Sequence, residues 1–216
     1  MSDTRSAFFR FHNGEKAPLP FSPDEYDTRL MALRAAMDHA GAEAVVFTSM
    51  HNIAYYSGFL YCSFGRPYGL VVTASEAVTI SAGIDAGQPW RRCHGDNITY
   101  TDWARDNFWR AVAHVAGPGR VVGYEADHLT LAQQERLKAF LSPAALVDMA
   151  PASMRQRMRK SPAEIALIRA GAAVADAGGY AIREAVAIGT REIDVAMAGR
   201  DAMELEIAQR FPDAEY

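Results

Sequence analysis

The sequence predicts an α/β domain, residues 22–155, in which helices cover a mixed β-sheet, followed by the start of a second, helical domain. Three observations predict this fold. Short β-branched runs alternate with segments of helical periodicity, two of those runs are spaced as in an antiparallel hairpin, and strand-like runs stop after Pro151. A hairpin inserted among strand–helix units combines antiparallel and parallel pairs, so the sheet is expected to be mixed.

The first predicted element is a helix that starts at Ser22. Residues 1–21 are polar and carry two prolines, and they are expected to form an irregular N-terminal extension. The residues Ser22-Pro23-Asp24-Glu25 combine an N-cap serine, a proline at the first helical position and a glutamate at the third. Apolar residues then recur at spacings of four and three as far as Met37, and Gly41 ends the helix.

The remaining elements of the first domain follow from short apolar runs and their flanking residues. The predicted strands are residues 44–48, 69–73, 78–81, 98–101, 120–124 and 145–149. The second and third of these form the hairpin. Helices are expected over residues 103–115 and from the N-cap Thr130 to Leu141, whereas His51 and Asn52 are expected to open a loop.

Residues 156–216 are expected to be a linker and the first helices of another domain. Ser161 to Glu164 repeats the capping pattern, and an apolar stripe that includes Ala172, Ala175 and Gly179 follows it. A second helix is expected over residues 192–210, with Thr190 as its cap. Two amphipathic helices without a sheet cannot bury both apolar faces, so this second domain is expected to be incomplete.

Composition excludes several classes of function. The net charge is −4 and the pI is near 5.9, which gives no electrostatic reason to bind nucleic acid. No apolar run is long enough to cross a bilayer and the N-terminus lacks a secretory signal, so no membrane association and a cytoplasmic location are expected. Cys62 and Cys93 are then expected to remain free thiols.

Motifs for self-contained catalysis are absent from the sequence. There is no HExxH, paired-cysteine, phosphate-loop or GxSxG pattern, and the six histidines are scattered. Cys93, His94 and Asp96 are possible metal ligands, but neighbouring residues rarely converge on one ion, so no metal and no cofactor are predicted. Asp85 is the best isolated carboxylate for a functional role, with a solvated loop as the alternative.

The most informative segment is Tyr55–Tyr68, which reads YYSGFLYCSFGRPY. It places six aromatic residues around Arg66, which lies between Gly65 and Pro67. A guanidinium on a short turn beside aromatic rings suits a small ligand that carries a carboxylate or a planar cation. The alternative is that these rings belong to the core and that Arg66 is an ordinary surface residue.

Three runs of this sequence resemble the N-terminal domain of the creatinases, or creatine amidinohydrolases. They are residues 48–73, 80–92 and 96–107, and the likeness continues through residues 154–172. The motif CSFGRPY is the most specific part of the match. The resemblance implies a creatinase/prolidase-type N-terminal α/β domain, the incomplete start of a pita-bread catalytic domain, and a homodimer.

The resemblance also implies an activity and two site residues. Creatinases hydrolyse creatine to sarcosine and urea without a metal, using a general-base histidine that is expected beyond Tyr216. No catalytic residue is therefore expected in this chain, which alone is expected to be inactive. Phe64 and Arg66 match residues that reach across the dimer interface to the substrate, with Arg66 implied to pair with the carboxylate of creatine or a similar guanidino carboxylate.

Two alternatives to a creatinase stay open at this point. The chain could act as a non-catalytic dimerisation module through its unpaired helices. It could also belong to a metal-dependent pita-bread relative, a peptidase or a lyase, whose metal ligands would come from outside these residues.

Overall fold

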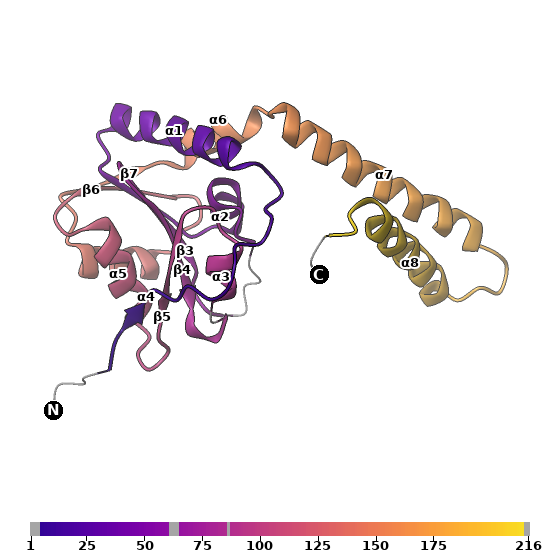
Figure 1. Ribbon diagram of the computed structural model, residues 1–216, viewed down its shortest axis with the longest axis horizontal. Coiled ribbons are helices and arrows are strands. Elements are labelled where there is room, and N and C mark those ends of the chain that lie inside the picture. The colour runs from indigo at the N-terminus through magenta and orange to yellow at the C-terminus, as the bar shows by residue number, and fades with distance from the viewer. Residues whose placement is uncertain (1–4, 61–64, 86, 214–216) are drawn as a thin grey trace. The chain divides into compact units, whose positions relative to one another are not determined.

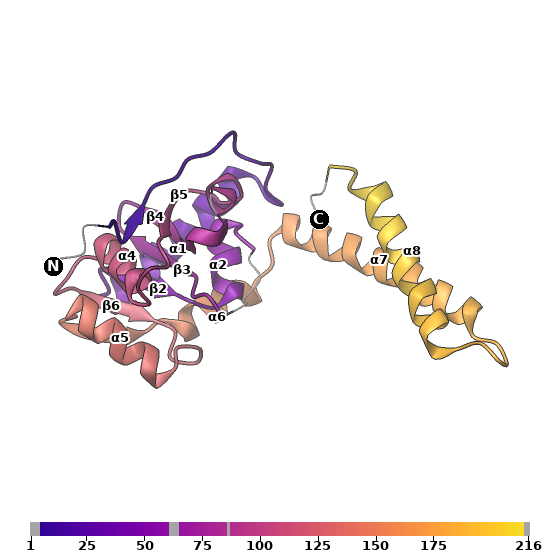
Figure 2. The same ribbon diagram turned by 90° about the horizontal axis from the view of Figure 1, so that it is seen from below.

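A computed structural model describes residues 5–60, 65–85 and 87–213, which divide into two compact units, residues 1–159 and 160–216 (Figures 1 and 2). The strands of the first unit are β1 (Phe8–Phe9), β2 (Ala44–Phe47), β3 (Gly69–Thr73), β4 (Ala77–Ala82), β5 (Asp96–Tyr100), β6 (Val121–Tyr124) and β7 (Ala145–Asp148). Its helices are α1 (Pro23–Ala40), α2 (Met50–Ser57), the 3-10 turn η1 (Gly83–Asp85), α3 (Gln88–Arg91), α4 (Asn107–Ala116), α5 (Leu131–Leu141) and α6 (Ala150–Met158). The second unit contains α7 (Pro162–Ala185) and α8 (Glu192–Arg210).

The sheet is mixed, as predicted. In the described residues its strand order is β1-β5-β4-β3-β2-β6-β7. The predicted hairpin is confirmed as the antiparallel pair β3–β4, and the pairs β4–β5, β2–β6 and β6–β7 are parallel. Because β3 is antiparallel to both β2 and β4, the strands β2, β4, β5, β6 and β7 all end at one edge of the sheet, where β3 begins.

Helices cover both faces of this sheet. Every residue of β2, β3 and β4 is buried, which requires packing on each side of the strands. Figure 1 shows α1 and α6 along one side and α4 and α5 along the other. Leu33 of α1 and Phe108 of α4 are among the largest fully buried side chains of the resulting core.

Two predicted helix starts are confirmed in atomic detail. The Ser22 side chain accepts a hydrogen bond from the Glu25 amide, and Pro23 occupies the first turn of α1. Thr130 and Gln133 form a complete capping box at the start of α5. Both signals are local, because the cap and its partner are three residues apart.

Three predictions for the first unit were wrong. Residues 1–21 are not wholly irregular, because Phe8 and Phe9 form the edge strand β1, which pairs with β5. His51 and Asn52 lie in helix α2, which Ser49 caps, and not in a loop. The helix expected from residue 103 begins at Asn107, whose side chain amide donates to Thr101 and ties the first turn back to the preceding segment.

Helices α3 and α6 were not predicted. Helix α3 has four residues, too few for an apolar period to appear in the sequence. Helix α6 carries Pro151 in its first turn, a position where the missing amide costs little. In the sequence the strand-like runs end at this proline and a linker is expected to follow, so the helix was missed.

The second unit is a pair of packed helices. Ser161 and Glu164 form the predicted capping box of α7. The close approach to α8 occurs at Gly178, where a Cβ would lie 2.6 Å from Met203 Cγ. A Cβ at Gly179, which the sequence placed on the apolar stripe, would meet no atom within 4 Å. The N-cap of α8 is Arg191 and not Thr190. Among the described helices, α7 alone has the length and mean hydropathy, 1.3, that would let it cross a membrane, judged by length and composition only.

Candidate functional site

The loop that carries Arg66 lies where β3 begins and where β4 and β5 end. Three contacts hold it. The Tyr100 hydroxyl donates to the Pro67 carbonyl at 3.0 Å, the Tyr68 hydroxyl donates to Asp85, and Arg66 Nη1 lies 3.0 Å from Asp102 Oδ1. Tyr100 is the last residue of β5, Asp102 follows that strand, and Asp85 lies in the turn after β4. The sheet therefore fixes both the backbone and the side chain of this loop.

Arg66 lines a groove of about 810 Å³. The groove is lined by Phe59, Leu60, Gly65, Arg66, Tyr68, Ile84, Asp85, Gln88, Pro89 and Arg92. Phe59 and Tyr68 are buried, whereas Leu60 and Ile84 are 69% and 71% exposed. The Arg66 side chain is 46% exposed. The groove thus has an aromatic floor, an apolar rim and a guanidinium that solvent reaches.

The groove is surrounded by charges of both signs, two arginines and two aspartates. Arg66 and Arg92 both line it, while Asp85 accepts from Tyr68 and Asp102 lies beside Arg66. A guanidinium has five N–H donors in a planar fork, so one carboxylate oxygen at 3.0 Å does not use them all. A ligand carboxylate can therefore share Arg66 with Asp102.

Tyr100 remains a proton donor to the loop over the whole physiological pH range. Burial raises the pKa of its hydroxyl strongly, the nearby Asp102 carboxylate raises it further, and Arg66 opposes the shift. The hydroxyl is 3.0 Å from the Pro67 carbonyl oxygen. This hydrogen bond thus anchors the backbone beside Arg66 without depending on pH near neutrality.

Of the two predicted substrate-binding residues, the structure describes one. Arg66 lies on the groove, and Phe64, like Cys62, lies outside the described residues. Asp85, the isolated carboxylate that the sequence singled out, also lines the groove and is held by Tyr68. Of the aromatic segment, Tyr56 belongs to the core, and Tyr68 belongs to the core and also lines the groove.

Within the described residues, the guanidinium enclosed by aromatic rings belongs to Arg29. Its Cζ lies 4.3 Å from the ring centroids of Phe21 and Tyr55, and it is 4% exposed. It also donates to the Tyr55 carbonyl at 2.9 Å and pairs with Glu25. Arg29, which the sequence analysis did not single out, is therefore a structural residue that joins α1 to α2.

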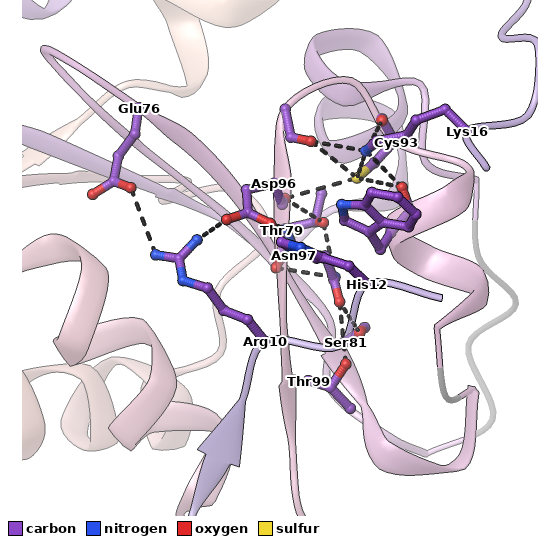
Figure 3. Close-up of polar contacts among 12 residues, drawn as sticks. Arg10, His12, Lys16, Glu76, Thr79, Ser81, Cys93, Asp96, Asn97 and Thr99 are labelled. Atoms are coloured by element: carbon purple, nitrogen blue, oxygen red, sulfur yellow. Dashed lines mark hydrogen bonds and ion pairs between the residues drawn. The ribbon is translucent and has the colours of Figure 1, made fainter. Parts of the chain in front are cut away.

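Cys93, His94 and Asp96 do not converge on one point. Cys93 is buried, His94 Nε2 lies 2.7 Å from Asp27, and Asp96 binds Arg10 and His12 (Figure 3). Over residues 5–60, 65–85 and 87–213, no group of three or more His, Cys, Asp or Glu side chains is arranged to hold a metal ion.

A second polar cluster, centred on Glu125, escaped the sequence analysis. Glu125 is 2% exposed, yet its carboxylate accepts hydrogen bonds from the amides of Thr48 and Ser49, the Ser49 hydroxyl and the Asn52 side chain amide. The Asn52 oxygen in turn accepts from Ser153 of α6 at 2.5 Å. The Glu125 carboxylate thus satisfies amides at the N-terminus of α2 and opposes the positive end of its helix dipole. Helix α2 leads into the segment that carries Arg66.

Sequence reasoning missed Arg92, which lines the groove, and Tyr100 and Asp102, which hold the loop that carries Arg66. A signal existed for Asp102, which is an acidic residue placed directly after a predicted strand. Ligands of open α/β sheets bind outside the carboxyl ends of strands. A search for polar residues at that position would have found Asp102 together with Glu125.

Comparison with known proteins places this chain in a family. The sequence profile of the creatinase/prolidase N-terminal domain matches residues 29–159. A protein named creatinase from Bacillus sp. (strain B-0618) is 49% identical over 208 residues, which cover 94% of this chain and 51% of that protein. An uncharacterized hydrolase/peptidase of Sinorhizobium fredii (strain NBRC 101917 / NGR234) is 28% identical over 194 residues, covering 83% of this chain and 50% of its own.

A solved structure agrees in fold. The prolidase from Pyrococcus horikoshii OT3 superimposes with a TM-score of 0.68 at 20% identity, covering 82% of this chain and 48% of the prolidase. The chain spans about half the length of the curated relatives it matches. The profile match covers more than half of the sequence, and the chain belongs to the creatinase/prolidase N-terminal domain family.

Proposed function

We propose that this chain is the N-terminal half of a cytoplasmic creatinase. The complete protein would add water across the amidino C–N bond of creatine and release sarcosine and urea. The observation that carries the proposal is the Arg66 groove, in a chain 49% identical to a creatinase over nearly all of its length. These residues contribute substrate binding and dimer contacts, and the acid–base chemistry belongs to a histidine outside this chain.

The groove suits one end of creatine. Creatine carries a carboxylate at one end and a planar guanidinium at the other. The fork of Arg66 can bind the carboxylate through two parallel hydrogen bonds, which a lysine could not provide. Phe64 is proposed to pack against the substrate beside it. In the proposed homodimer both residues serve the active site of the partner subunit, which agrees with the solvent-exposed position of Arg66.

The decisive experiment uses the full-length enzyme and its Arg66→Ala variant. Loss of a charged hydrogen bond to the substrate should cost about 2–3 kcal/mol of transition-state binding, or roughly 30- to 150-fold in kcat/KM for urea release. Arg136→Ala is the matched control, because Arg136 also pairs with an aspartate, Asp106, at 3.1 Å but lies away from the groove.

The control variant should keep the kinetics of the wild type. Equal kcat/KM values for Arg66→Ala and the wild type would remove Arg66 from the site. A full-length protein that releases no urea from creatine would overturn the proposed activity itself.

A metal-dependent dipeptidase is the second candidate, because the similar solved structures include prolidases and an Xaa-Pro dipeptidase. The same full-length protein decides between the two. Hydrolysis of an Xaa-Pro dipeptide that is lost on chelation and restored by a divalent metal, without urea release from creatine, would establish this alternative.

A further inference from the structure

The N-terminal segment Arg10–Ala17, which we call the strap, is bound to α3 through Lys16. The Lys16 ammonium donates to the carbonyl oxygens of Trp90 at 2.6 Å, Cys93 at 2.9 Å and Gly95 at 2.9 Å (Figure 3). It also lies 4.7 Å from the Trp90 ring centroid. One side chain thus binds backbone carbonyls both in α3 and in the turn that follows it.

Other strap contacts reinforce this attachment. The His12 ring stacks on the Trp90 ring at 4.8 Å, and His12 Nε2 lies 2.8 Å from Asp96 Oδ1. Arg10 pairs with the same aspartate (Figure 3). Two hydrogen bonds to backbone carbonyls also join the strap to α3. The Ala17 amide donates to the Arg91 carbonyl, and Arg91 Nε donates to the Glu15 carbonyl.

Helix α3 divides its residues between the strap and the groove. Trp90 and Arg91 contact the strap, whereas Gln88, Pro89 and the adjoining Arg92 line the groove. Four residues form a single helical turn, which is not stable through its own hydrogen bonds. The position of α3 therefore depends on what packs against it.

The approach of the strap is close enough to require glycine at the start of α3. Gly87 has φ +79°, and a Cβ there would lie 2.7 Å from Asn13 Cβ. Any other residue would be strained in its own backbone and would also push the strap away. The turn before α3 is thus shaped for the strap.

We propose that the strap is a positioning element of the groove, with Lys16 as the residue that sets where α3, and with it Gln88 and Arg92, stand relative to Arg66. Its kinetic consequence rests on the proposed function. The strap precedes residues 29–159, the part of the chain that the family profile matches, so it extends the site beyond the matched domain.

Cys93 offers a direct measure of strap attachment. Its side chain is 1% exposed, and its Sγ lies 3.7 Å from Lys16 Nζ. Burial raises the pKa of this thiol, which keeps it protonated and unreactive. When the strap detaches, the thiol should become accessible to an alkylating reagent.

The test compares Lys16→Met with Lys138→Met in the full-length protein. Methionine keeps the apolar stem of Lys16 and removes the ammonium, whereas Lys138 forms an exposed pair with Glu135 on α5. For Lys16→Met we expect hydrogen exchange in peptides covering residues 83–95 and maleimide labelling of the Cys93 peptide each to rise about tenfold or more. We expect KM for creatine to rise roughly fivefold with kcat within about twofold, and Lys138→Met to change none of these values.

Asp96→Asn is the second variant, because it removes the charge that Arg10 and His12 share while keeping the shape of the side chain. It should shift exchange and labelling in the same direction by a smaller factor, and it decides the question if Lys16→Met does not fold. Unchanged exchange and labelling would overturn the proposal, as would faster exchange with unchanged kcat/KM. A wild-type enzyme without urea release would overturn the proposed function alone, since exchange of the groove-lining residues would still decide whether the strap positions them.

Discussion

Two carboxylates at the same edge of the sheet have opposite surroundings. Glu125 follows β6, is 2% exposed and accepts four hydrogen bonds from α2 and its approach. Asp102 follows β5, has a side chain that is 32% exposed, and pairs with the half-exposed Arg66. The first carboxylate is fully satisfied inside the protein. The second leaves its partner open to solvent.

The difference separates folding from recognition. A buried carboxylate must have its hydrogen bonds made internally, because water cannot replace them, so the Glu125 cluster fixes how α2 begins. An exposed ion pair contributes little to stability and can exchange partners with a ligand. We therefore expect substitutions at Glu125 to act on stability and substitutions around Arg66 to act on substrate binding.

The largest expected effect comes from Glu125→Ala. The substitution leaves two backbone amides, a hydroxyl and a side chain amide buried without their acceptor, and unpaired buried groups are costly. We expect the free energy of unfolding to fall by about 3–5 kcal/mol, measured by urea denaturation of the full-length protein.

Glu135→Ala is the control for that experiment. The Glu135 side chain is 70% exposed and pairs with Lys138, so its loss should change the free energy of unfolding by less than about 0.5 kcal/mol. A similarly small change for Glu125→Ala would show that the buried cluster does not anchor α2.

Tyr56, another buried polar residue, makes a pH-dependent contribution to the free energy of unfolding. Its hydroxyl donates to Gln156 Oε1 at 3.0 Å, and burial raises its pKa to about 12. Because the folded-state pKa is above the unfolded value near 10, the stabilisation is fully present below pH 10 and is lost as the pH rises from about 10 to about 12. Over this interval the free energy of unfolding should fall in the wild type by up to about 2–3 kcal/mol more than it falls in the Tyr56→Phe variant.

The measurement is the free energy of unfolding between pH 8 and 12. Tyr180→Phe serves as the control, because Tyr180 is 59% exposed, and it should follow the wild-type curve. Identical pH curves for Tyr56→Phe and the wild type would mean that the buried hydroxyl does not carry this part of the pH dependence.

Signals that were local in the sequence predicted most of the fold. The capping residues Ser22, Thr130 and Ser161 each contact a partner three residues ahead, and the β3–β4 hairpin joins neighbouring strands. Helix α3 and the short strand β1 could not be predicted in this way. Both depend on packing between the N-terminal segment and residues about 70 to 90 positions later, which leaves no periodic pattern.

The same limit applied to the groove. Arg66 was predictable because Gly65 and Pro67 mark a defined turn beside it. Its neighbours Tyr100 and Asp102 were not, since only the register of β4 against β5, with Ala82 opposite Tyr100, brings them to the loop. Arg66 precedes β3, whereas Tyr100 and Asp102 lie at and after the end of β5. The order and direction of the strands bring them together, and the spacing of residues along the sequence does not reveal that order.

The smallest expected change in the free energy of unfolding is that of Asp102→Ala, and it gives the sharpest contrast with Glu125→Ala. Both partners of the Arg66–Asp102 pair are partly exposed, so water can hydrate the guanidinium that remains. We expect the free energy of unfolding to change by less than about 1 kcal/mol in urea denaturation, while KM for creatine rises because Arg66 is no longer held toward the groove. A loss as large as that of Glu125→Ala would make Asp102 a structural residue, and the contrast between the two carboxylates would then fail. Unchanged KM with unchanged stability would instead mean that Tyr100 and Tyr68 hold the loop well enough without the ion pair.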